Sequence, residues 1–166
     1  MTKEKQYTET RKLEKIVVNV GVGKLRNLAN FDDKVLPAVM EELALITGQK
    51  PATRQTKRSI AGFKTREGDI VGLQVTLRRR HMGGFLSKVI HIALPRVKDF
   101  RGLELSNVDE HGNLNVGFRE QYIFPEVSAE KSKVIFGMQV TLVPREKNRT
   151  NAIDFYRSIG IPLKAK

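Results

Sequence analysis

The chain has 166 residues, a formal charge of +12 and no cysteine. A chain of this length can bury roughly two thirds of its unfolded surface in one domain, and without cysteine it forms neither disulfide bonds nor thiolate metal sites. No run approaches the roughly 20 apolar residues of a membrane span, and the first residues lack the apolar stretch of a signal peptide. We therefore expect a soluble, unsecreted single domain over residues 1–166, with residues 1–11 as a flexible N-terminal extension and no membrane partner.

The positive charge is concentrated in the middle of the chain. Residues 45–101 hold 13 Lys/Arg and 3 Asp/Glu, which is +10 of the formal +12. A basic surface that is merely solvated has no reason to concentrate its charge in this way, whereas a surface that binds a polyanion does. We therefore favour a nucleic acid as the partner, and the alternative is a solvated basic face.

The first expected element is a strand over residues 13–20, followed by a glycine-rich turn and a lysine at 21–24. A Walker phosphate loop needs an earlier glycine where this chain has Val18, and a hydroxyl residue where it has Leu25. The third glycine of the dinucleotide fingerprint falls on Arg26. We therefore interpret the glycines as the turn that ends a strand, and we expect no nucleotide cofactor.

Apolar spacing predicts the remaining elements. Residues 31–48 are typical of a helix with Asp32 or Asp33 as its cap and Gly48 at its end. The other expected elements are a short strand at 51–56, a basic loop at 57–69, a strand at 70–78, a helix at 83–94 stopped by Pro95, strands at 115–124 and 137–144, and a helix at 150–160. Because strands and helices do not alternate as βαβ units, we expect an α+β domain: an antiparallel sheet with helices packed on one face and an open RNA-binding face.

Polar and apolar residues alternate along the expected strands, so their polar residues should share the open face of the sheet. The expected face consists of Asn19, Gln74, Thr76, Arg78, Arg119, Gln121, Gln139 and Thr141. A merely solvated face usually includes carboxylates, but a surface that meets phosphates and base edges should exclude them, as this one does. The face also lacks the exposed aromatic pair that stacks single-stranded bases, which favours structured RNA.

Groups that could perform catalysis do not converge in the sequence. The three histidines, His81, His91 and His111, are far apart and have no metal-binding spacing. We therefore expect a binding protein with no metal, cofactor or catalytic residue. Two other classes stay open: a stand-alone RNA chaperone or regulator, and an RNA-modifying enzyme whose site lies within residues 104–134.

Several long motifs occur in a fixed order: "KLEKIVVNVGVG", "ALITGQKP", "SIAGF-K-REG", "VTLR", "IALPRVKDFRGL", "EQYIFPE" and "GMQVTLV". With these motifs the chain resembles, from about residue 12 to 163, the universal ribosomal protein five family of the large subunit, in its bacterial or organellar type. The resemblance implies a structural constituent of the cytoplasmic or organellar large ribosomal subunit that anchors 5S rRNA in the central protuberance. The further partners it implies are 23S-type rRNA, peptidyl-site tRNA, neighbouring large-subunit proteins and a small-subunit head protein.

The resemblance also implies site residues. Its RNA-facing sheet positions fall on Asn19, Gln49, Thr76 and Arg78. Its tRNA-contacting basic loop falls on Ser59, Gly62, Phe63, Lys64, Thr65 and Arg66. Its subunit-bridge loop falls on Asp109, Glu110, His111 and Gly112, where "SFDGRGNY" of the family is replaced by "SNVDEHGNL".

Two alternatives to these assignments stay open. Asn19 can instead hydrogen-bond the turn that follows its strand. The basic loop can be a flexible loop without a ligand. The chain also mostly lacks the longer N-terminal helical segment of many bacterial members, and we do not assume unchanged bridge contacts through residues 109–112.

Overall fold

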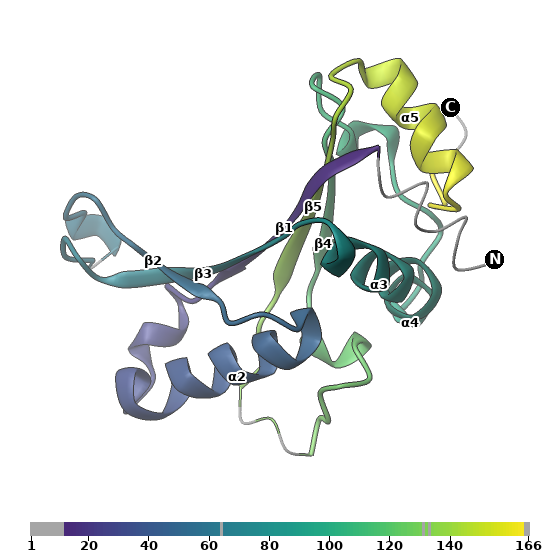
Figure 1. The fold of residues 1–166 in the computed structure, drawn as a ribbon. Helices are drawn as coiled ribbons and strands as arrows, with labels where there is room; N and C mark the ends of the chain where they lie inside the picture. The colour runs from purple at the N-terminus through teal and green to yellow at the C-terminus, as the bar shows by residue number, and fades with distance from the viewer. Residues whose placement is uncertain (1–11, 64, 131, 133, 165–166) are drawn as a thin grey trace. The chain divides into compact units, whose positions relative to one another are not determined.

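The computed structural model of the protein describes residues 12–63, 65–130, 132 and 134–164. Its strands are β1 Leu13–Gly21, β2 Ala52–Gln55, β3 Ile70–Leu77, β4 Leu114–Phe118 and β5 Met138–Pro144. They form one antiparallel sheet of five strands in the order β2-β3-β1-β5-β4 (Figure 1). The expected α+β class is confirmed, while the proposed extension at 1–11 lies outside the described residues.

The helices are α2 Leu36–Thr47, α3 Arg80–Lys88, α4 Leu94–Arg96 and α5 Arg149–Ser158. A π-helical turn at Phe31–Val35 precedes α2, which has Pro37 near its start, and a second at Val89–Ala93 precedes α4, which contains Pro95. Proline has no N–H to donate, and a wider turn just before it lets the helix pass through. The expected stop at Pro95 is therefore wrong, because the helix continues to Arg96.

The beginnings of two helices also differ from expectation. The first helical turn starts at Phe31 after Asn30, which has the left-handed backbone angle φ of 56°. Asn tolerates this conformation better than most residues. Asp32 and Asp33 therefore lie inside the first turn and do not cap it. Their negative charges still interact favourably with the positive end of the helix dipole. The second expected helix begins at Arg80, before the predicted residue 83.

The chain divides into two compact units. The first contains residues 1–17, 76–118 and 139–166, and its core includes Leu77 and Leu142, both at most 1% exposed. In this unit Tyr156 of α5 is fully buried, and its hydroxyl lies 2.8 Å from Gly112 O and 3.1 Å from Leu142 O. Burial raises the pKa of this hydroxyl above its ordinary value. The neutral tyrosine hydroxyl can therefore donate its proton to these carbonyl oxygens, and it connects α5 to strand β5.

The second unit contains residues 18–75 and 119–138. Its hairpin pairs β2 with β3, for example Ala52 opposite Gln74 and Arg54 opposite Gly72. Figure 1 shows the connection between these strands extending beyond them as the end of the hairpin. Helix α2 ends at Gly48, which has φ of 71°, as the sequence predicts.

The alternation expected along the strands is confirmed on β1, β3 and β5. On β3, Leu73, Val75 and Leu77 are buried, while Gln74 and Thr76 between them are half-buried. On β5, buried Met138, Val140 and Leu142 alternate with exposed Gln139 and half-buried Thr141. The strand expected at 115–124 is instead β4, which begins one residue earlier and ends at Phe118.

Candidate nucleic-acid interface

Three polar side chains of the second unit form a hydrogen-bonded row across β2, β3 and β1, which we call the Arg54 row. Arg54 Nε donates to Gln74 Oε1 at 2.9 Å, and Gln74 Nε2 donates to Asn19 Oδ1 at 3.0 Å. Arg54 Nη2 also donates to Gln74 Oε1. Asn19 is thus held by Gln74 and not by the turn after its strand. Among the described residues none accepts from Asn19 Nδ2, so the row leaves this amide group as a donor for a ligand.

A second polar cluster, the Asn115 cluster, lies on β4 and β5 in the first unit. Gln139 Nε2 donates to Asn115 Oδ1 at 3.0 Å, and Thr141 Oγ1 donates to the same oxygen at 2.7 Å. The Asn115 oxygen is therefore occupied, whereas its Nδ2 donors and the Gln139 carbonyl have no partner in the described part of the chain. Asn115 was absent from the expected face, although its place between buried Leu114 and Val116 is a local signal that could have found it.

The remaining residues expected to face RNA lie outside the Arg54 row and the Asn115 cluster, and they differ in their exposure to solvent. Thr76 is half-buried between buried neighbours on β3, and Arg78 is exposed directly after that strand. Arg119 is exposed directly after β4. Gln49 is half-buried just after the end of α2, and its backbone carbonyl accepts from Thr47 Oγ1 at 3.1 Å.

Gln121 does not belong to the open face, because it is completely buried in a 3-10 turn at Gln121–Ile123. Its Nε2 donates to Val134 O at 2.7 Å and lies 3.1 Å from Ser132 Oγ and 3.2 Å from Glu42 Oε2. Its Oε1 accepts from Phe136 N at 3.0 Å. The chain leaves the strand after Phe118, which turns the amide into the unit's interior, where several polar groups satisfy it.

Backbone hydrogen bonds cross the basic loop at residues 57–69. Thr56 N donates to Asp69 O at 2.9 Å, and Ile60 and Thr65 form a further antiparallel bridge. Ser59 Oγ accepts from Glu67 N at 3.0 Å. A 3-10 turn at Ala61–Phe63, which includes Gly62, occupies the end of the loop.

These contacts continue the β2–β3 hairpin, and we call residues 57–69 the hairpin extension. Ser59 and Arg66 are exposed on it, and Thr65 is half-buried. Lys64 lies outside the described residues, as does the side chain of Phe63.

Asp69 fixes the base of this hairpin extension. Its Oδ2 accepts from Arg66 N at 2.5 Å and forms an ion pair with Arg26 Nη1 at 2.6 Å. The Arg66 backbone hydrogen bond lowers the pKa of Asp69, burial opposes this shift, and Arg26 adds to the lowering. The carboxylate therefore stays ionised at neutral pH and holds the base of the loop against the turn at residues 25–27.

The loop at residues 109–112 is held by Asp109. Its Oδ1 accepts from His111 N at 2.9 Å and from Asn113 N at 2.8 Å, and its Oδ2 accepts from Asn113 Nδ2 at 2.8 Å. Burial by itself would raise the pKa of Asp109, but the hydrogen bonds from Asn113 and His111 together lower it. Glu110 and His111 are exposed at the tip. The loop therefore presents one acidic and one imidazole side chain from a fixed turn.

Gly112 closes this loop with φ of +79°, and a Cβ atom added there would lie 2.8 Å from the Ala152 side chain. We expect Gly112→Ala to lower the free energy of unfolding by about 2–4 kcal/mol, because strain of the left-handed backbone adds to overpacking against α5. Urea denaturation measures the change. Gly160→Ala is the matched control, because Gly160 has φ of +88° but open space around its Cβ position. Equal losses in the two variants would contradict the packing contribution.

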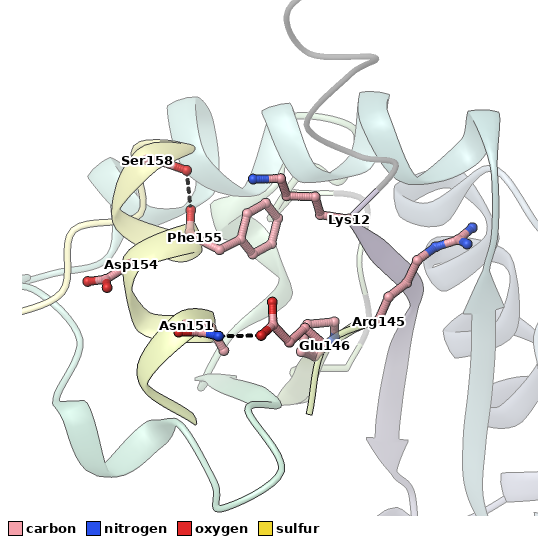
Figure 2. Close-up of a pocket in the computed structure, with 9 residues that line it drawn as sticks. Lys12, Arg145, Glu146, Asn151, Asp154, Phe155 and Ser158 are labelled. Atoms are coloured by element: carbon pink, nitrogen blue, oxygen red, sulfur yellow. Dashed lines mark hydrogen bonds between the residues drawn. The ribbon is translucent and has the colours of Figure 1, made fainter. Parts of the chain in front are cut away.

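A cavity of about 590 Å³ lies beside α5 in the first unit (Figure 2). Its walls are formed by Lys12, Pro144, Arg145, Glu146, Asn151, Ala152, Asp154, Phe155 and Ser158. Lys12 Nζ lies 5.8 Å from the centre of the Phe155 ring, and Asn151 donates to the Glu146 carboxylate. The two carboxylates among cations and apolar groups do not suit a phosphate backbone, so we exclude this cavity from the nucleic-acid interface.

No cluster of three His, Cys, Asp or Glu side chains that could hold a metal ion occurs among the described residues. Within the same part of the chain, no helix is both long enough and apolar enough to cross a membrane.

Comparison with known proteins assigns the chain to a family. The model described as "Ribosomal protein L5" matches residues 8–66, and the model of the C-terminal part of the same ribosomal family matches residues 70–163. The large ribosomal subunit protein uL5 of Chlorobaculum tepidum is 44% identical over 99% of this chain and 87% of its own length. The uL5 of Thermus thermophilus is 43% identical over 94% of this chain and 84% of its own length.

These matches define a structural protein of the ribosome and not an enzyme. Within this class, the chain belongs to the ribosomal protein L5 family. The resemblance noted in its motifs is therefore confirmed, and with it the ribosome as the place where the protein resides.

Proposed function

We propose that this protein binds 5S rRNA and anchors it in the central protuberance of the large ribosomal subunit. The choice of 5S rRNA rests on the family resemblance. The observation that carries RNA binding is the pair of polar strand surfaces, the Arg54 row and the Asn115 cluster, which hold amide groups in fixed positions without a carboxylate. The other partners of the proposal are 23S-type rRNA and neighbouring large-subunit proteins.

The hydrogen bonds within each polar set support this role physically. An amide whose oxygen is already held has lost most of its rotational freedom before binding, so less entropy is lost when a ligand docks. Its remaining N–H groups can donate to phosphate oxygens, to the ribose 2′-hydroxyl or to base edges, the groups that structured RNA presents. Exposed Arg78 and Arg119 then supply charge to the phosphates, which positions the RNA without reading its sequence.

Binding should depend strongly on salt. If about five phosphates are neutralised, the logarithm of the association constant should fall against the logarithm of salt concentration with a slope of about −3.5 to −4.5. Fluorescence anisotropy of a labelled 5S rRNA transcript, titrated at several KCl concentrations, measures this slope. A flat response would contradict the electrostatic part of the proposal.

A second experiment separates the ribosomal role from that of a free RNA chaperone. The protein should co-sediment with large subunits, and removal of 5S rRNA from those subunits should abolish co-sedimentation. Retention on subunits without 5S rRNA would instead indicate that 23S-type rRNA or a neighbouring protein holds it.

We further propose that the hairpin extension at 57–69 contacts peptidyl-site tRNA. The extension is anchored at its base by Asp69 and carries exposed Arg66, and cations on a projecting arm suit a phosphate backbone. We also propose that exposed Glu110 and His111 meet a small-subunit head protein, through contacts altered from those of the "SFDGRGNY" loop.

The hairpin extension can be tested by replacing residues 61–64 with Gly-Ser-Gly-Ser, which leaves the Ile60–Thr65 bridge and the Asp69 anchor intact. We expect 5S rRNA affinity within about two-fold of wild type, but peptidyl-site tRNA dissociating about three- to ten-fold faster from assembled ribosomes. This change suits the loss of one phosphate contact, because Lys64 is the single cation in the replaced segment. Filter binding of labelled tRNA measures the rate. Unchanged tRNA dissociation would refute the contact, and loss of 5S rRNA binding would place the extension in the primary RNA site.

A further inference from the structure

Arg79 occupies a backbone conformation that favours glycine. Its φ is 53° and its ψ is −126°, at the corner where β3 ends and α3 begins. His81 N donates to Arg78 O at 3.3 Å and closes the turn around it. The angles match the first central position of a type II′ turn, which is normally glycine. Among the residues that the structure describes, the other non-glycine residues with positive φ are Asn30 and Asp99, types that tolerate it, so the arginine is the exception.

No interaction within the described part of the chain explains an arginine at this corner. The side chain is exposed, and among the described residues no carboxylate or carbonyl pairs with its guanidinium group. Its neighbours Arg78 and Arg80 are also exposed. Residues 78–101 hold seven Lys/Arg and one acidic residue, and the two arginines directly adjacent in the chain repel the Arg79 guanidinium group. Backbone strain together with like-charge repulsion works against folding, and such outliers are concentrated at ligand-binding positions.

We propose that Arg79 is a further RNA-contacting residue, whose guanidinium group binds a phosphate of the rRNA next to the one contacted by Arg78. This inference rests on the proposed RNA-binding function. Consecutive Cα atoms are about 3.8 Å apart, so two neighbouring arginines can reach successive phosphates of one strand. A glycine at position 79 would form the same corner without strain, but it would remove this cation.

The test compares Arg79→Gly, Arg79→Ala and Arg79→Lys. Glycine removes both the cation and the strain, alanine removes the cation and keeps the strain, and lysine keeps both. Arg157→Ala is the control, because Arg157 is an exposed cation on α5 of the same unit, outside the proposed interface. Binding to a labelled 5S rRNA transcript is measured by anisotropy across KCl concentrations, and thermal unfolding is followed by circular dichroism.

We expect the glycine and alanine variants to bind about ten-fold more weakly, with the salt slope reduced in magnitude by about 0.7–0.9, which corresponds to one phosphate contact. The lysine variant and the Arg157→Ala control should bind within about three-fold of wild type. The glycine variant should melt roughly 2–6 °C above the alanine variant, because it alone relieves the strain.

The possible failures are distinguishable. Wild-type affinity and slope in the glycine variant, or an equal loss in the Arg157→Ala control, would overturn the role of Arg79 while leaving the proposed function intact. Equal melting temperatures of the glycine and alanine variants would overturn the strain at the corner. If the wild-type protein itself does not bind the transcript, the proposed function fails and this inference fails with it.

Discussion

Replacing Leu77 by aspartate is expected to remove at least about 4 kcal/mol from the free energy of unfolding, a large part of the 5–15 kcal/mol that stabilises a typical domain. Leu77 is completely buried on β3. The substitution leaves an unpaired carboxylate where the leucine packed, so loss of apolar contacts adds to the cost of burying a charge. Urea denaturation followed by circular dichroism measures the loss, and Leu77→Ala separates the packing contribution from the charge.

The neighbouring residue provides a matched contrast. Arg78 is exposed directly after β3, so Arg78→Ala should change the free energy of unfolding by less than about 0.5 kcal/mol while weakening RNA binding. A one-residue error in strand register would exchange the two faces of the strand. If Arg78→Ala unfolded the protein and Leu77→Asp only weakened binding, the assignment of faces on β3 would be wrong.

Introducing a carboxylate at Thr76 is expected to weaken binding of 5S rRNA by at least about thirty-fold. Thr76 is half-buried between the buried residues of β3, on the side that we assign to RNA. A carboxylate facing phosphates experiences like-charge repulsion, which costs several kcal/mol at an interface, and each 1.4 kcal/mol is a factor of ten in affinity. Anisotropy titrations with a labelled transcript measure the change.

Two control variants isolate this charge. Thr76→Gln introduces a side chain of nearly the same size as Thr76→Glu but without its charge. Thr76→Ala removes only the hydroxyl and a methyl group. Both controls should bind within about ten-fold of wild type, as expected for the loss of a single neutral hydrogen bond. If the glutamate variant bound as tightly as the glutamine variant, with folding intact, this side of β3 would not face RNA.

The strands could be predicted from the sequence because burial on one face leaves a pattern of period two. Leu73, Val75 and Leu77 record that period directly, and so do Met138, Val140 and Leu142. The face on which each strand residue lies follows from its immediate neighbours in the chain, so no knowledge of distant segments is needed. The same reasoning places Gly48 at the end of α2, because a positive φ there is a local requirement.

The sequence-based predictions failed where residues far away in the chain determine the position of a side chain or the end of an element. The interior position of Gln121 depends on Glu42, which is 79 residues away in the chain, and on the backbone near residue 134. Continued alternation after Phe118 therefore could not reveal that the strand had ended. The alternation of Asn115 with buried Leu114 and Val116 was a local signal, but its partners Gln139 and Thr141 follow only from the pairing of β4 with β5. Passage through Pro95 depends on a π turn that leaves no periodic signature in the sequence.

The buried amide of Gln121 also determines how the segment at 119–138 can move. One side chain is bonded to Phe136 N and to Val134 O, and it lies within hydrogen-bond distance of groups on Ser132 and on α2. The amide hydrogen of Phe136 is therefore shielded from solvent exchange although it lies outside any strand. Releasing it requires the Gln121 side chain to leave its position, which breaks the other bonds at the same time. The contacts of Gln121 with Ser132, Val134 and Phe136 should thus open cooperatively, and not one by one as at the fraying end of a surface loop.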